Sequence, residues 1–397
     1  MKRLTLSALI ALLTFVVGIG ASAAWLVTPA RPASPPNKVN QTTKQPALEM
    51  VFVLDTTGSM SGLIEGAKAK IWGIVNDVMQ NSSRPAVRIG LVAYRDIGDQ
   101  YVTQVLPLTD DLDKVYVTLM DYRAEGGGDE PENVRRALAD GVHKAGWSPQ
   151  NSGQTAQVIF LVGDAPPHDD YQNEPDILTT TAEAVKSGMI VNTIQCGNSS
   201  LTRQSWEQIA RRGEGRYFAI AQDGGVEVVS TPFDSRLTEL GAKLGSTFMA
   251  YGGGAGTAGR MFRQETAAAQ EVVEVRVTRS APASASADRA VNKALNSKAY
   301  ANDLLQGIEN ESVKLDTVKD EDLPDEVRKL SPEGRKAEIN KRLEARRKLR
   351  AEIVSLSKQR DAHLAAERKK HTAGKQGGFD AAVSSALKEQ MARKGIK

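Results

Sequence analysis

The chain of 397 residues has one cysteine, four histidines and only 5% aromatic residues. A single cysteine, Cys196, can form neither an intrachain disulfide nor a zinc site by itself. It lies in an apolar run, which indicates a buried strand thiol. The histidines show no HExxH spacing, so nothing supports a zinc enzyme. With few aromatic residues, the cores must be built from Ala, Val, Leu and Ile, as in α/β sheets and helical bundles.

Charge is unevenly distributed along a chain that is 41% hydrophobic and 25% charged. This composition excludes collagen-like, polytopic membrane and wholly disordered proteins. Residues 328–397 carry 20 Lys and Arg but only 8 Asp and Glu, and the preceding part is net acidic. The basic region is either a helix with a solvated charged face or a site for an anionic partner. It has too few aromatic residues for base stacking, and no nucleic acid is expected.

The N-terminus has the pattern of an export signal. Lys2 and Arg3 precede an apolar run over 4–20, and Ala-Ser-Ala follows at 21–23. We therefore expect residues 1–23 to be a signal peptide and the protein to be periplasmic or secreted. Because the apolar run continues to Val27, an uncleaved membrane anchor is the alternative. Residues 24–46, rich in Pro, Asn, Gln and Thr, are predicted to be a flexible linker.

Residues 47–251 alternate between continuously apolar runs and amphipathic stretches. This alternation predicts a doubly wound α/β domain with a mostly parallel sheet flanked by helices. The expected strands are 49–55, 87–94, 102–108, 158–162, 189–194 and 216–220, and the expected helices are 62–80, 112–122, 132–145, 177–187, 205–212 and 233–251.

The remainder is predicted to be a linker followed by a charged, basic, mainly α-helical region. Residues 252–287 are rich in Gly, Ala and Ser, and alternating valines at 271–278 indicate a short strand within them. Helices are expected in the region 288–397, at 290–308, 333–370 and 379–396. A strict heptad in the long helix would place Arg346 and Arg360 at the apolar positions, which disfavours a long coiled coil. We expect instead a helical hairpin, with 379–396 folding back onto the long helix.

An acid and two hydroxyls occupy alternate positions after the first strand. Asp55, Thr57 and Ser59 can converge on one point, with Gly58 permitting the turn. This is the carboxyl end of a strand, where open α/β sheets bind ligands, and three oxygens suit a hard cation. The alternative is helix capping by these residues.

Two further aspartates are expected at the same edge of the sheet. Asp129 ends a glycine loop before a helix, and Asp164 follows an apolar strand. VFVLDTTGSM, GGGDEPENVRRAL and VIFLVGDAPP, taken in this order, resemble the three motifs of the von Willebrand factor type A (VWA) domain. The resemblance covers residues 47–250 and implies a Rossmann-like fold. It also implies a metal-ion-dependent adhesion site for Mg²⁺ or Ca²⁺, with Asp55, Thr57, Ser59, Asp129 and Asp164 as ligands, some of them through water.

The sequence departs from the family pattern at two of these positions. Thr57 replaces a serine and keeps the hydroxyl. Asp129 stands where adhesion receptors have threonine, so it adds a negative charge. The extra carboxylate should hold the ion more tightly and make it less attractive to a partner's carboxylate.

His168, Asp169 and Asp170 follow the third motif and are interpreted as a solvated rim. A metal-dependent hydrolase using Asp129, His168 and Asp169 is an alternative that lacks an identifiable nucleophile. The resemblance implies a non-enzymatic, metal-dependent protein that binds a protein or an envelope polymer, as an adhesion or scaffold protein. The other alternative is an envelope assembly factor that works with a separate ATPase or chaperone.

Overall fold

The computed structural model describes residues 45–80, 85–128, 131–150, 153–223, 225, 229–371 and 379–396. These residues belong to one compact unit. The predicted signal peptide, nearly all of the predicted linker and Asp129 lie outside the described residues. Within the described part of the chain, no helix is both long enough and apolar enough to cross a membrane.

Six strands form one sheet in the order β3-β2-β1-β4-β5-β6, and only the β2–β3 pairing is antiparallel. The strands are β1 Ala47–Asp55, β2 Ala86–Tyr94, β3 Thr103–Thr109, β4 Thr155–Gly163, β5 Ile190–Cys196 and β6 Glu214–Ile220. Strands β1, β4 and β5 are buried along almost their whole length, as their continuous apolar sequences require of strands covered on both faces. The predicted fold class is confirmed.

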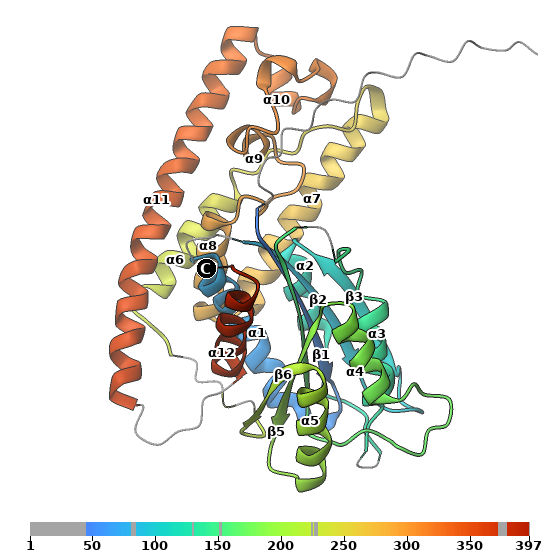
Figure 1. The fold of residues 1–397 in the computed structure, drawn as a ribbon. Coiled ribbons are helices and arrows are strands. Elements are labelled where there is room, and N and C mark those ends of the chain that lie inside the picture. Colours follow the sequence, from blue (N-terminus) through green and yellow to red (C-terminus); the bar gives the residue numbers. More distant parts are fainter. Residues whose placement is uncertain are drawn as a thin grey trace, which may run out of the picture. The chain divides into compact units, whose positions relative to one another are not determined.

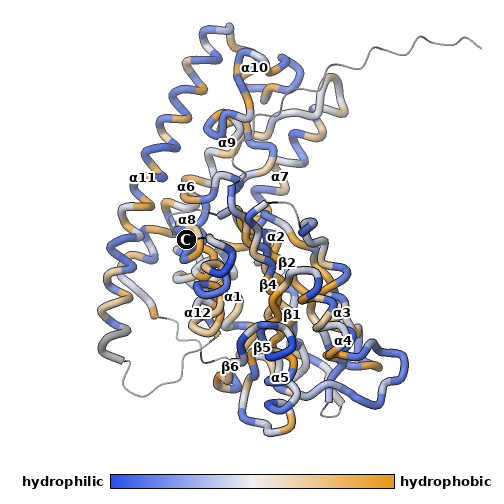
Figure 2. Tube along the Cα trace, viewed as in Figure 1, coloured by the Kyte–Doolittle hydropathy of each residue, from blue (hydrophilic) through white to orange (hydrophobic). Residues whose placement is uncertain are grey.

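Helices cover both faces of the sheet (Figure 1). On one face lie α1 Ser61–Met79, α2 Leu112–Asp121 and α12 Phe379–Arg393, which share a large apolar core with the sheet. On the other lie α3 Val134–His143, α4 Ile177–Lys186 and α5 Ser200–Arg212, which form a second core. Figure 2 shows the strands as the most hydrophobic part of the trace. Helix α5 begins at Ser200, earlier than predicted, because Ser199 caps it by accepting a hydrogen bond from the Thr202 N–H.

Most of the remaining helices form two smaller apolar clusters beside the sheet domain. The elements are α6 Asp234–Gly245, α7 Gly256–Ser280, α8 Ala283–Leu295, α9 Leu304–Glu309, α10 Asp325–Arg328 and α11 Pro332–His371, with the short 3-10 helices η1 Gly58–Met60, η2 Leu315–Thr317 and η3 Asp320–Asp322. One cluster joins α6, α8 and the middle of α11, and the other joins α9, α10 and the start of α11. The exceptions are η1, which lies in the loop after β1, and α7, whose buried Val277 belongs to the large core. Helix α8 also packs on α1, which links this region to the sheet domain.

The predicted linker with a strand at 271–278 is wrong, because these residues belong to α7. The valines at 273 and 277 are four residues apart, so they lie on one helix face as readily as on one strand face. The preceding Ala267–Ala269 favours helix, and the helix continues through the valines.

The predicted linker over 280–287 is also wrong, because α8 begins within it. Its small residues serve close packing. A side-chain carbon added to Gly241 of α6 would lie 2.7 Å from the Cβ of Ala290, which shows how closely α6 and α8 approach. A composition rich in small residues is therefore compatible with a closely packed helix interface as well as with a linker.

The long helix and α12 do not form the predicted hairpin. Helix α12 packs against α1 and strands β4, β5 and β6, whereas α11 packs against short helices, mainly α6 and α8. Phe379 of α12 lies against Phe52, with ring centroids 5.9 Å apart. Asn192 of β5 and Gln390 exchange two hydrogen bonds through their buried amides, of 3.0 and 2.6 Å. Helix α12 therefore completes one face of the sheet.

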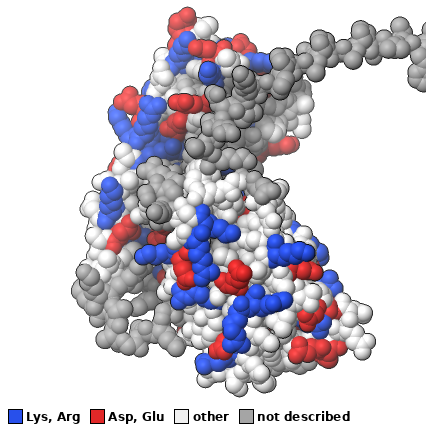
Figure 3. Space-filling view, in the orientation of Figure 1, with Lys and Arg blue, Asp and Glu red and all other residues white. Residues whose placement is uncertain are grey.

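Arg346 and Arg360 occupy buried positions on α11, at the places where a heptad would put them. Each pairs with carboxylates from other helices: Arg346 with Asp303, and Arg360 with Asp234 and Asp288. Figure 3 shows basic and acidic side chains intermingled on the visible face, over both α11 and the sheet domain. The basic region is therefore not simply a solvated charged helix, because part of its charge is neutralised inside the protein.

Candidate functional site

Asp55 lies at the carboxyl end of the central strand β1 and is fully buried. Its Oδ1 accepts hydrogen bonds from the Thr57 N–H (2.8 Å) and from the Thr57 hydroxyl (2.6 Å). Its Oδ2 is buried and has no hydrogen-bond partner in the described structure. Burial, with a further contribution from Asp164, raises the pKa of Asp55 to about 7. A buried oxygen left in this state requires a proton or a cation.

Asp164 follows β4, the neighbour of β1, so parallel pairing brings it to the same edge of the sheet. Its Oδ2 accepts a hydrogen bond of 2.6 Å from the side chain of Gln222, in the loop after β6. Its backbone carbonyl accepts a bond of 2.8 Å from the Thr202 hydroxyl. Gln222 thus satisfies one oxygen of a predicted metal ligand, which sequence reasoning did not anticipate.

The other three predicted ligands differ in their placement. Thr57 is buried beside Asp55, whereas Ser59 is exposed within η1. Asp129 lies outside the described residues. Gly58 and Gly126 approach closely, since the Gly58 N–H donates to the Gly126 carbonyl at 3.2 Å. The first and second motif loops therefore meet, as the resemblance implied.

Glu132, which sequence reasoning missed, is a buried acid near Asp55. Its Oε2 has no hydrogen-bond partner in the described structure. Burial, together with the charges of Asp55 and Asp96, raises its pKa to about 9. Its backbone bonds to the third motif loop: its N–H donates to Pro166 and its carbonyl accepts from His168. Glu132 is the third acid in GGGDEPE, and it was overlooked because only Asp129 matched the family pattern.

His168 is buried, so its interpretation as part of a solvated rim is wrong. Its ring stacks on Tyr171 with centroids 4.1 Å apart, and its Nδ1 lies 2.8 Å from Asp170. Its Nε2 lies 3.5 Å from Asp96, which also accepts a 2.6 Å hydrogen bond from the Tyr171 hydroxyl. Asp169 and Asp170 are exposed. His168 therefore fixes the third loop against the loop after β2.

Arg135 of α3 fixes the third motif loop by hydrogen bonds to its backbone carbonyls. It donates hydrogen bonds to the carbonyls of His168, Asp169, Tyr171, Glu174 and Pro175. Five carbonyl acceptors for one guanidinium give the loop a defined conformation. The loop that carries the predicted third ligand is thus built on the rigid α3.

The donor set at this edge consists of oxygens, which Mg²⁺ and Ca²⁺ prefer. Within the described residues, no three His, Cys, Asp or Glu side chains are grouped closely enough to hold a metal ion. Whether a cation fits this site therefore depends on three kinds of group. They are the carboxylate of Asp55, whose Oδ2 has no hydrogen-bond donor, the hydroxyls of Thr57 and Ser59, and the carboxylate of Asp129, which lies outside the described residues. Asp55 and Glu132 both have buried oxygens that a cation would satisfy.

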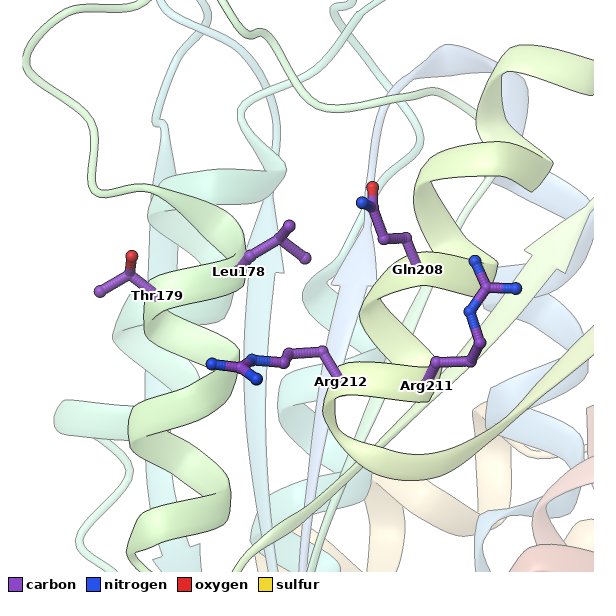
Figure 4. A pocket seen from close by; sticks show the side chains of 5 residues that line it. All are labelled: Leu178, Thr179, Gln208, Arg211 and Arg212. Carbon is purple, nitrogen blue, oxygen red and sulfur yellow. The ribbon is translucent and has the colours of Figure 1, made fainter.

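A separate groove lies between α4 and α5 (Figure 4). Its lining side chains are Leu178, Thr179, Gln208, Arg211 and Arg212. Leu178 points from α4 towards α5, and Arg212 extends from α5 towards α4. None of these residues belongs to the sheet-edge cluster, so the groove is not part of the candidate metal site.

Residues 49–232 match the family model described as von Willebrand factor A domain. This part of the chain is therefore a VWA domain. Von Willebrand factor A domain-containing protein 7 of Rattus norvegicus is 30% identical over 211 residues, which cover 51% of this chain and 21% of that protein. The human protein of the same name is 30% identical over 206 residues, 52% of this chain and 21% of that protein. The chain thus spans about a fifth of the length of these relatives.

Solved structures of low sequence identity were also found. BatB from Bacteroides thetaiotaomicron is 16% identical with a TM-score of 0.33, and the match covers 44% of this chain and 90% of BatB. The SpRpn10 VWA domain is 17% identical with a TM-score of 0.32, covering 45% and 89%. Proximal thread matrix protein 1 from the mussel byssus was solved with zinc in its metal-ion-dependent adhesion site (MIDAS) motif. It is 14% identical with a TM-score of 0.35, and the match covers 45% of this chain and 43% of that chain.

Proposed function

We propose that this protein is an exported, non-enzymatic binding protein whose VWA domain engages a protein or envelope polymer in a metal-dependent manner. The match to the VWA family model supports the coarser part of this function, a role in protein binding. The observation that supports metal dependence is the buried Asp55 Oδ2, which lacks a hydrogen-bond partner at the carboxyl end of the central strand.

The proposed ligands of Mg²⁺ or Ca²⁺ are Asp55, Thr57, Ser59, Asp129 and Asp164. Thr57 already donates both its hydroxyl and its N–H to Asp55 Oδ1, so Oδ2 is left to face the ion. Gln222 donates to Asp164 Oδ2, and this bond would be exchanged for the ion or for a water bound to it. An ion at this edge would hold the three motif loops together and present them to a partner.

The excess of acid at the site supports retention of the ion. A bound cation would displace the protons that the raised pKa values of Asp55 and Glu132 favour, and these two groups would then add their negative charge to that of Asp164 and Asp129. A cation held by so many carboxylates has little residual charge with which to attract a further carboxylate. We therefore propose that the ion organises the binding loops and that the partner contacts the loops as well as the metal.

Metal binding is expected to raise the thermal stability of the protein, and Asp55→Asn is expected to abolish this rise. Binding to the native state stabilises it by about 2.7 kcal/mol when the free ion is at 100 times its Kd. Unfolding of the full chain is measured with Mg²⁺, Ca²⁺ or EDTA, and binding by isothermal titration. Asp169→Asn, which changes an exposed acid on the third loop, is the matched control and should respond like the wild type. Equal metal responses in Asp55→Asn and the wild type would refute the proposed site.

A further inference from the structure

Helix α7 carries an apolar surface that the described structure leaves uncovered. Within the described residues, seven large hydrophobic side chains are exposed, and four of them belong to this helix: Met261 (51%), Phe262 (38%), Val272 (63%) and Val275 (41%). Ala268 is also exposed. With 3.6 residues per turn, Met261, Ala268, Val272 and Val275 fall on one side of the helix, and we call them the α7 stripe.

The opposite side of α7 is fixed to the protein. Near its N-terminus, Arg263 donates hydrogen bonds of 2.7 Å to the carbonyls of Gly252 and Glu321. Near its C-terminus, Glu274 pairs with the buried Arg289 at 2.5 Å, and Val277 is buried in the large core. Figure 1 shows α7 extending from the end of the sheet domain next to α2. The helix is therefore anchored at both ends, and its stripe is presented in one defined orientation.

This helix buries few of its own side chains. Of its 25 residues, only Gly259, Arg263 and Val277 are buried. Helices in proteins owe most of their stability to packing of an apolar face, and α7 has its larger apolar face in solvent. A contiguous exposed apolar surface of this kind indicates an interaction site.

The stripe has the spacing of a coiled-coil contact. Positions 261, 268 and 275 are seven residues apart, and positions 265, 272 and 279 each follow one of them by four residues. The second set places Glu265 and Arg279, both exposed, on the same side as the apolar residues. A partner helix must therefore offer apolar surface together with one basic and one acidic group.

A second copy of α7, running antiparallel, meets these requirements. With the two-fold axis near residue 270, Ala268 lies opposite Val272 of the second copy, so a small residue faces a larger one. Glu265 lies opposite Val275 and within one turn of Arg279 of the second copy, and the symmetry creates this pairing of opposite charges twice. In a parallel pair the same residues would face their own copies, with Glu265 against Glu265.

We propose that the α7 stripe is a self-association surface through which two copies of this chain form an antiparallel α7 pair. The interaction is independent of the metal site, because the stripe includes none of the proposed ligands. One helix pair buries less surface than most stable dimer interfaces, so the dimer should be weak and should form in a concentration-dependent manner. Two VWA domains would then act together on one partner or surface.

Sedimentation of the full chain over a range of concentrations tests this proposal. The wild type should show a monomer–dimer equilibrium. Ala268→Glu places a charge in the stripe and should weaken the dimer by roughly tenfold or more, since each 1.4 kcal/mol is a factor of ten. Ala267→Glu, at the neighbouring exposed position outside the stripe, is the matched control and should dimerise normally. Circular dichroism of both variants establishes that α7 remains folded.

Exchange of the charged pair distinguishes this antiparallel register from other modes of association. Glu265→Arg alone and Arg279→Glu alone should each weaken the dimer, and the double variant should restore it. A wild type that stays monomeric at every concentration would overturn the proposal. A dimer that Ala268→Glu leaves unchanged would overturn it as well, since association would then use another surface.

Discussion

A chain that ends at His371, and so lacks α12, is expected to lose its cooperative unfolding transition. Phe379, Val383, Ala386, Leu387 and Met391 are buried against the sheet and α1. Without them, apolar side chains of β4, β5 and α1 face solvent, and removal of even one large core side chain costs about 2–5 kcal/mol. The total exceeds the stability of a typical domain, about 5–15 kcal/mol. Circular dichroism and urea titration of the truncated and full chains measure the effect.

A point variant gives a graded form of the same test. Leu387→Ala should lower the free energy of unfolding by about 2–5 kcal/mol while the protein still folds. The neighbouring Lys388→Ala, at an exposed position, should change it by less than about 0.5 kcal/mol. Full stability of the truncated chain would show that α12 does not complete the sheet face in solution.

Arg346→Ala is expected to destabilise the protein by about 3–5 kcal/mol, because it leaves a buried carboxylate without its counter-ion. Arg346 and Asp303 are both completely buried. Asp303 also accepts hydrogen bonds from the Met249 N–H (2.8 Å) and the Gln306 N–H (3.1 Å), so it links α9 and the segment after α6 to α11. Urea unfolding at neutral pH measures the loss.

The adjacent Arg347 provides the control, because it lies on the same helix and is exposed. Arg347→Ala should have little effect, within about 0.5 kcal/mol. In a double-mutant cycle, adding Asp303→Asn to Arg346→Ala should recover part of the loss, since it removes the unpaired charge. If Arg346→Ala and Arg347→Ala lowered the free energy of unfolding by similar amounts, the buried Arg346–Asp303 pair would contribute no more to stability than an exposed arginine.

The sheet could be predicted because its signal is local. Continuous apolar runs such as 158–162 are typical of strands covered on both faces, and their alternation with amphipathic stretches predicted the fold. The helical region was harder, because its signal depends on tertiary partners. The small residues of α8 and the alternating valines of α7 are each compatible with more than one secondary structure. Nothing in the sequence near Phe379 indicates that this side chain packs against Phe52.

Part of the candidate site could be predicted, because the carboxyl ends of parallel strands lie at the same edge of the sheet. Asp55, Thr57 and Asp164 were placed there by the positions of β1 and β4 in the sequence. Glu132 and Gln222 were missed, because each reaches the site from a loop or helix start whose course the motifs do not specify. The complete ligand set remains a prediction, since Asp129 lies outside the described residues.

The closure of the sheet by α12 also governs the order of folding. β1 begins at Ala47, yet the helix that covers it and its neighbours starts at Phe379. Loops of this length make native contacts slow to form, and a growing chain must carry an open apolar sheet face while more than three hundred residues are added. Until α12 is made, we expect the nascent protein to need protection from aggregation. A nonsense codon that removes only α12 should therefore have the same effect as loss of the whole protein.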